Sequence, residues 1–193
     1  VSKELVDKGM RTRAKAINFG ILYGMGVNAL KANLGVNRRE AQEFYDKYFE
    51  TFAGLATYLD KIKAKTRRQG YSETLFGRRR YFTGLDSPLP YVQAAAERMA
   101  TNAPIQGTQA DIIKIAMKRI DEHIKAEKHE DDTHLILQVH DELVYEVKDS
   151  LVDEAVVHFR KLMEQVLPEE QTFGVPIIAE VMTGENWEDM KHI

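Results

Sequence analysis

The 193-residue sequence contains no cysteine, no long apolar run and no histidine pair of a familiar metal-binding spacing. The absence of cysteine excludes disulfide bonds and every thiolate metal site, and it fits a reducing compartment. No apolar run approaches the roughly 18–20 residues of a membrane span, and the charged N-terminal segment is not followed by the apolar core of a signal peptide. We therefore expect a soluble, cytoplasmic protein without a membrane partner.

The six histidines show no HExxH or similar pairing. We therefore expect carboxylates to be the metal ligands, if the protein binds a metal. The hydrophobic content of 44% excludes a disordered chain, and the length allows one or two domains with a substantial core.

Charge is unevenly distributed along the chain, although the net charge is only −3. The segment 61–80 carries eight lysines and arginines against the single acid Glu73, whereas acids dominate from Glu130 onward. This asymmetry indicates a basic surface for phosphates and an acidic region elsewhere. The alternative is that both runs are ordinary solvated faces.

Helical periodicity dominates the first part of the chain. Asn37 followed by Glu40 predicts a capping box at the start of one helix, and Gly70 predicts the end of another. Pro104 predicts a break between two later helices. The expected helices span 10–24, 27–34, 38–50, 53–69, 91–103, 106–127 and 150–166; the expected hairpins span 71–83 and 134–147, and a strand is expected over 175–182. This order predicts an α+β fold with a helical layer and an antiparallel sheet.

Two apolar runs in LILQVHDELVYEV, residues 135–147, meet at His140-Asp141-Glu142 without a glycine. Two-residue hairpin turns need positive φ and favour Asn-Gly, Asp-Gly or Gly-X, so this turn is unusual. Mg²⁺ typically takes one or two protein carboxylates plus substrate phosphates. The tip could supply such ligands, or its acids could simply solvate an exposed turn.

Arg11, Lys15, Phe19 and Tyr23 recur every four residues. On a helix they follow one stripe, with cations toward the N-terminus and aromatics further along. Cations there strengthen attraction for a polyanionic phosphate group, and the aromatics could face a sugar and a base. The alternative is an amphipathic helix with an aromatic core stripe. Gly20 and Gly24 suggest that something packs closely against this helix or that it moves.

Arg98, Asn102 and Gln106 repeat the four-residue spacing, and all three side chains donate hydrogen bonds. Acceptors in the DNA minor groove are nearly the same for every base pair, so donors placed there can check pair geometry without reading sequence. Exposed polar residues on a helix are the alternative interpretation of each one.

Together these segments resemble the family A DNA polymerases of the bacterial DNA polymerase I type. RTRAKAINFGILYGMG resembles the fingers-helix motif, and QVHDE at 138–142 resembles the last palm motif. TLFGRRR at 74–80 and ERMATNAPIQGTQAD at 97–111 also resemble family stretches, in the expected order. The resemblance covers essentially the whole chain and implies part of a right-hand polymerase fold, with fingers at 1–70 and palm at 71–193.

The resemblance also implies a role for each candidate residue. Arg11 and Lys15 would hold the phosphates of the incoming deoxynucleotide, with Lys15 also a candidate acid toward the pyrophosphate. Phe19 would face the sugar, where Phe usually discriminates against sugars lacking the 3′-hydroxyl, and Tyr23 would border the base-pair site. Asp141 would be the catalytic Mg²⁺ ligand, with a weaker role for Glu142. The residues implied to touch primer-template DNA are Arg98, Asn102, Gln106 and His140.

The implied activity is template-directed DNA synthesis by a two-metal mechanism, in a protein that is monomeric at full length. The family's second catalytic aspartate lies in an earlier motif like DYSQIELR, which this sequence lacks. We therefore expect a C-terminal polymerase fragment with little or no activity alone, because one aspartate cannot easily bridge two cations. The alternative is a non-catalytic nucleic-acid-binding remnant of the same fold.

Overall fold

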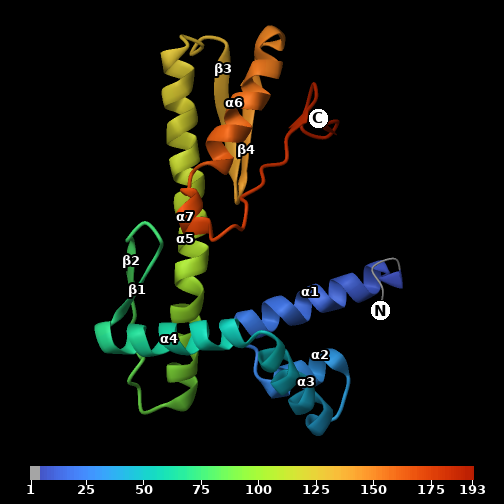
Figure 1. The fold of residues 1–193 in the computed structure, drawn as a ribbon, viewed down its shortest axis with the longest axis vertical. Coiled ribbons are helices and arrows are strands. Elements are labelled where there is room, and N and C mark those ends of the chain that lie inside the picture. Colours follow the sequence, from blue (N-terminus) through green and yellow to red (C-terminus); the bar gives the residue numbers. More distant parts are fainter. Residues whose placement is uncertain (1–4) are drawn as a thin grey trace. The chain divides into compact units, whose positions relative to one another are not determined.

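The computed structural model describes residues 5–193 and divides the chain into two compact units (Figure 1). The first unit ends at Ile105, and the second is Gln106–Ile193. Each unit is described by itself below. No helix within residues 5–193 combines the length and apolar character needed to cross a membrane.

The first unit begins with three helices, α1 (Lys8–Leu22), α2 (Val27–Leu34) and α3 (Arg38–Thr51). Asp7 caps α1, since its Oδ1 accepts a hydrogen bond from the Met10 amide at 2.7 Å. The three helices share one apolar core, and its buried members are Ile17, Ile21 and Leu30, with Met25, Leu34, Tyr45, Tyr48 and Phe49 packed around them.

Local signals fixed the helix ends as the sequence predicted. Asn37 and Glu40 form the reciprocal capping box at the start of α3, with bonds of 3.0 and 3.1 Å. Helix α4 (Ala53–Gln69) ends at Gly70, which takes a left-handed φ of 79°. Both predictions are confirmed because each rests on hydrogen bonds between residues close in sequence.

The predicted hairpin after Gly70 is present as β1 (Tyr71–Glu73) and β2 (Arg79–Tyr81). Its acid Glu73 neutralises part of the basic segment, because it accepts from Arg79 at 2.8 Å and lies 3.5 Å from Lys65. The hydrogen bond from Arg79 lowers the pKa of Glu73 below its usual value. Arg67 is also paired, with Glu97 at 2.5 Å. The basic segment is therefore a partly ion-paired surface.

Helix α5 runs without interruption over Pro90–Ala126, with Pro104 inside it. The predicted break at Pro104 is therefore wrong. An internal proline costs one backbone hydrogen bond and about 3 kcal/mol. Close packing offsets this cost, because small side chains in the turns that precede the proline, Ala96, Ala100 and Ala103, are buried.

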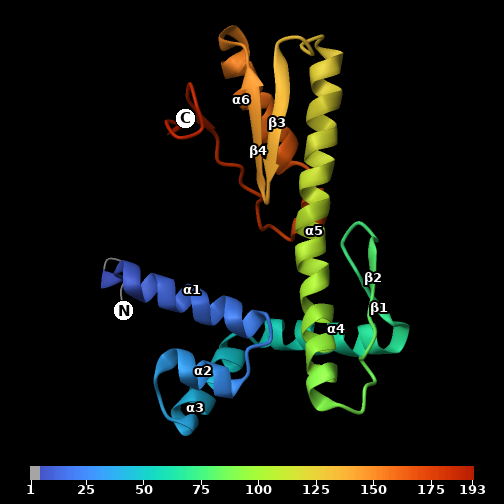
Figure 2. The ribbon, with the colours of Figure 1, turned by 180° about the vertical axis from the view of Figure 1, so that it is seen from behind.

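The second unit pairs β3 (Thr133–Val139) with β4 (Glu142–Val147) in an antiparallel hairpin that contains a bulge between Leu135 and Leu137. Helix α6 (Val152–Glu164) covers one face of this hairpin, as the opposite views of Figures 1 and 2 show. Tyr145 of β4 contacts Phe159 of α6, with ring centroids 4.8 Å apart. Burial raises the pKa of Tyr145 to about 12.

Buried residues of α5 complete the core of the second unit at helical spacing, namely Ile113, Ala116, Ile120 and Ile124. Arg119 ties α5 to the end of α6, because its Nη1 donates to the Gln165 carbonyl at 2.7 Å. The α5–α6–hairpin arrangement therefore rests on apolar burial and on the charge-assisted hydrogen bonds of Arg119 to the Gln165 and Val166 carbonyls.

The C-terminal segment contains short elements, η2 (Asp149–Leu151) before α6, then α7 (Glu169–Thr172), β5 (Met182–Thr183) and β6 (Lys191–His192). The strand predicted over 175–182 is wrong except at Met182, where β5 pairs with β6. Val175 and Ile178 are 70% and 72% exposed. High β propensity does not produce a strand without a partner to pair with, and residues 175–181 pair with no strand in the described chain.

Candidate functional site

The cation–aromatic stripe on α1 faces solvent from Arg11 to Phe19, and Tyr23 at its end is half-buried. Arg11 and Lys15 are exposed, and Phe19 is 42% exposed, while Ile17 and Ile21 of the same helix are buried. The alternative interpretation, in which the aromatics form a core stripe, is wrong for Phe19. The residues of α1 that face the core are Ile17 and Ile21 instead. Phe19 and the two cations of the stripe are therefore exposed to a ligand.

Lys15, Phe19 and Tyr23 contact one another in sequence order. The Lys15 ammonium lies 5.9 Å from the centroid of the Phe19 ring. The Phe19 and Tyr23 rings are stacked, with centroids 6.0 Å apart and an interplanar angle of 17°. Tyr23 ends the helix as its C-cap. The stripe therefore passes from charge to aromatic surface over consecutive turns.

The C-terminal end of α1 meets Arg98 of α5 at Gly24. Gly24 has a φ of +88°, and a Cβ built on it would lie 2.6 Å from Cγ of Arg98. Of the two explanations that the sequence left open for Gly20 and Gly24, close packing or a moving helix, close packing is observed at Gly24. A cavity of about 300 Å³ opens beside this contact, and its lining includes Ile21, Leu22, Gly24, Phe49, Arg98 and Thr101.

Replacing Gly24 by Ala is expected to lower the free energy of unfolding by about 1–3 kcal/mol, because the new methyl group meets both an unfavourable φ and the Arg98 side chain. Chemical denaturation measures the change. Gly54→Ala is the matched control, since Gly54 lies in α4 with no atom within 4 Å of the added Cβ. That control is expected to be neutral or to stabilise by about 0.5 kcal/mol. Equal changes in the free energy of unfolding for Gly24→Ala and Gly54→Ala would contradict a specific role for the backbone conformation and the Arg98 contact at Gly24.

The three predicted DNA donors lie on the single helix α5. Arg98 and Gln106 are exposed, and Asn102 is half-buried. Oδ1 of Asn102 is buried and has no hydrogen-bond partner among residues 5–193. A buried acceptor without a partner costs about 1–3 kcal/mol.

The hairpin tip places His140 and Asp141 between the paired residues Val139 and Glu142. His140 takes a φ of 52°, the left-handed conformation that the sequence predicted such a turn to need. Gln138 supports it by donating from Nε2 to the His140 carbonyl at 2.9 Å. Asp141 and Glu142 are both exposed. The tip therefore presents two carboxylates on a turn whose backbone conformation is costly for a non-glycine residue.

Each unit thus carries its own part of the predicted site. The first unit brings the end of the α1 stripe together with Arg98 and also holds Asn102, and the second holds Gln106 and the hairpin tip. A further group was missed from the sequence. His123 of α5 lies beside Glu154 and His158 of α6, with one possible ligand atom from each residue within 4.8 Å of the others. This group is a second candidate for metal binding, beside the carboxylates that the sequence predicted.

Comparison with known proteins identifies the fold that carries these features. The family model described as DNA polymerase family A matches residues 1–189. The chain belongs to this family. The structure is similar to the POL domain of Pol1 from M. smegmatis, in a complex with DNA primer-template and dNTP, with a TM-score of 0.82 and 39% identity over 87% of this chain and 29% of that one. The predicted α+β polymerase fold is confirmed.

Curated relatives agree with this assignment. The chain is 43% identical over 187 residues to the thermostable DNA polymerase I of Thermus filiformis, covering 97% of this chain and 22% of the relative. It is 42% identical over 189 residues to DNA polymerase I of Pseudomonas aeruginosa, covering 98% of this chain and 20% of that relative. The chain therefore spans about a fifth of the length of these relatives.

Proposed function

We propose that this chain supplies the nucleotide-binding helix and one catalytic carboxylate of a template-directed DNA polymerase, which transfers deoxynucleotides to a primer 3′-hydroxyl. The observation that carries the proposal is the solvent-facing stripe of Arg11, Lys15 and Phe19 on α1, in a member of DNA polymerase family A. Its partners are primer-template DNA and deoxynucleoside triphosphates. The protein of which it forms part acts as a monomer in the cytoplasm.

Helix α1 can hold a nucleotide along its length. Arg11 and Lys15 lie one turn apart, about 6 Å along the axis, so both cations can contact one triphosphate. No acidic residue occupies the first turn of the helix, and the one carboxylate at its start, the N-cap Asp7, is engaged with the Met10 amide. Phe19 follows at the next turn, where it would meet the sugar, and Tyr23 would border the base. The cation–π contact with Phe19 holds the Lys15 ammonium group between Arg11, where the phosphates would bind, and Tyr23, where the base would lie.

The hairpin tip fits Mg²⁺ by the chemistry of its donors. Asp141 and Glu142 offer exposed carboxylate oxygens, the ligands that this hard cation prefers, and substrate phosphates would supply further oxygen ligands. Asp141 would be the principal ligand and Glu142 a weaker one. When bound there, Mg²⁺ would supply the chemistry that activates the primer 3′-hydroxyl and neutralises charge on the triphosphate. His140 would lie against the primer terminus, and Lys15 would donate a proton to the departing pyrophosphate.

Arg98, Asn102 and Gln106 would contact the minor groove of the primer-template near the insertion site. The groove presents similar acceptors for every base pair, so donors there tolerate any correct pair. In this assignment residues 1–70 belong to the fingers and residues 71–193 to the palm. Arg98 would then connect DNA binding with nucleotide binding, since it already packs against Gly24 at the end of the nucleotide-binding helix α1.

The test uses a hybrid polymerase, in which this chain replaces the matching C-terminal part of the Thermus filiformis relative. We expect Mg²⁺-dependent extension of a primed template with all four deoxynucleotides. The unjoined 193-residue chain is expected to extend primers at least about 10³-fold more slowly, because it supplies one of two carboxylates. Salt-sensitive binding of primer-template without extension would instead support a nucleic-acid-binding remnant.

Phe19→Tyr in the hybrid polymerase is expected to increase use of dideoxynucleotides by about tenfold or more, because the added hydroxyl can replace the hydrogen bond that the missing 3′-hydroxyl would make. Single-nucleotide incorporation of paired deoxy and dideoxy substrates measures the ratio. Phe49→Tyr is the control, since Phe49 packs in the α1–α3 core and belongs to no substrate contact in this assignment. An unchanged ratio in Phe19→Tyr would exclude Phe19 as the residue facing the sugar.

A further inference from the structure

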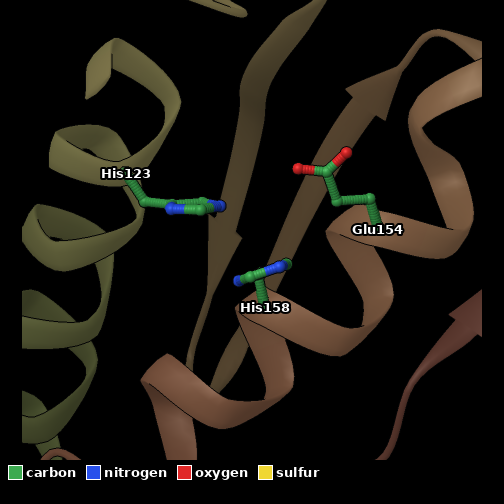
Figure 3. A group of neighbouring side chains, drawn as sticks. All are labelled: His123, Glu154 and His158. Atoms are coloured by element: carbon green, nitrogen blue, oxygen red, sulfur yellow. The ribbon is translucent and has the colours of Figure 1, made fainter. Parts of the chain in front are cut away.

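The second unit contains a cluster of two imidazoles and one carboxylate to which the proposed polymerase function assigns no role. His123 extends from α5 toward α6, and Glu154 and His158 extend from α6 to meet it (Figure 3). Glu154 and His158 are four residues apart, so they lie on one face of the helix. Potential ligand atoms of all three lie within 4.8 Å of one another.

We propose that His123, Glu154 and His158 form a binding site for a borderline-soft divalent transition-metal ion such as Zn²⁺, separate from the Mg²⁺ carboxylates of the hairpin tip. Imidazole and carboxylate are ligands for Zn²⁺, and two histidines with one carboxylate leave a fourth position for water. Hard cations such as Mg²⁺ prefer all-oxygen sites, so the cluster selects a different metal from Asp141.

The surroundings hold the first ligand in position. The His123 ring is half-buried and makes an edge contact with Phe159, with centroids 6.4 Å apart and an interplanar angle of 87°. Phe159 in turn packs on Tyr145 at 4.8 Å. Glu154 and His158 are exposed, so they can adjust while His123 stays fixed. An incoming ion therefore meets one oriented ligand and two adaptable ones.

Binding requires a small and specific rearrangement. The His123 and His158 rings are now stacked, with centroids 4.7 Å apart and an interplanar angle of 19°. An ion bonds in the plane of each ring, so two stacked rings cannot both point at it, and the exposed His158 must rotate. Tetrahedral Zn²⁺ places neighbouring ligand atoms about 3.4 Å apart, given bonds of about 2.0–2.1 Å. The bound ion would then clamp α6 to α5.

A calorimetric titration of the 193-residue chain with Zn²⁺, carried out in excess Mg²⁺, tests the proposal. The Mg²⁺ occupies oxygen sites and competes poorly for imidazole, so the heat reports binding at the histidine cluster. We expect one Zn²⁺ per chain with a dissociation constant of about 10 µM or tighter. His123→Ala, His158→Ala and Glu154→Gln should each weaken binding by at least about 10–100-fold. His192→Ala, at an exposed histidine of β6, should leave binding unchanged.

Substituting Co²⁺ for Zn²⁺ gives a second readout, because intense visible absorption reports tetrahedral coordination. The absorption should appear with the unsubstituted chain and with His192→Ala, and it should disappear in His158→Ala. Circular dichroism checks that each variant folds, and the exposed positions Glu154 and His158 carry the test if His123→Ala does not fold. Absence of Zn²⁺ binding by the unsubstituted chain, or equal affinity in His158→Ala, overturns the proposal.

Discussion

Asp141→Asn should slow nucleotide incorporation by the hybrid polymerase by about 10³-fold or more, which corresponds to at least about 4 kcal/mol of transition-state stabilisation. The substitution keeps the size of the side chain and removes its charge, so the hairpin tip loses its principal ligand for Mg²⁺. Single-turnover incorporation at saturating deoxynucleotide measures the loss. Primer-template affinity should change little, because Asp141 is not one of the DNA donors in this assignment.

Glu146→Gln is the matched control for the charge. Glu146 lies exposed on the same hairpin, opposite His134 and away from the tip. Its loss should alter incorporation less than about twofold, as expected of a surface substitution far from the chemistry. If Asp141→Asn incorporates nucleotides as fast as Glu146→Gln, Asp141 is not a catalytic ligand.

Lys15→Met should reduce incorporation by about 10³-fold in the hybrid polymerase. A charge-assisted bond to phosphate contributes about 1.5–3 kcal/mol, and a positioned acid adds about 10²–10⁴-fold. Lys15→Arg separates the two contributions, since it keeps the charge but cannot release a proton near neutral pH. We expect Lys15→Arg to recover nucleotide affinity, seen as KM, more than kcat.

Arg13→Met tests whether any cation on α1 would serve. Arg13 is exposed on the same helix but lies two residues from Lys15, off the stripe that runs through Arg11, Lys15 and Phe19. Its loss should change incorporation only a few-fold. Equal losses for Arg13→Met and Lys15→Met would indicate a general electrostatic attraction rather than a positioned contact.

The sequence predicted those parts of the fold and site that depend on near neighbours. The Asn37–Glu40 capping box, the Gly70 helix end and the left-handed His140 all follow from hydrogen bonds or turn geometry within a few residues. The alignment of Arg11, Lys15 and Phe19 along one face of α1 follows from their four-residue spacing, whereas the exposure of that face was left open by the sequence. These features need no knowledge of which distant elements pack together.

The failures all involve distant contacts. Pro104 remains within α5 because the alanines that precede it are buried, and periodicity along one helix does not report that packing. The apolar residues 175–181 have strand propensity but no pairing strand among residues 5–193. His123 meets His158 only when α6 folds back onto α5, so the one local signal was the four-residue spacing of Glu154 and His158.

Asp141→Cys tests the central claim most directly, namely that this position binds the catalytic metal. The chain has no other cysteine, so the substitution introduces its only thiol. A thiolate is a poor ligand for Mg²⁺ and a good one for softer ions such as Cd²⁺. We predict that the Asp141→Cys hybrid polymerase is inactive with Mg²⁺ and regains primer extension when Cd²⁺ is added, relative to Asp141→Ala under the same conditions. Full activity with Mg²⁺ alone, or no recovery beyond that of Asp141→Ala, would contradict the account.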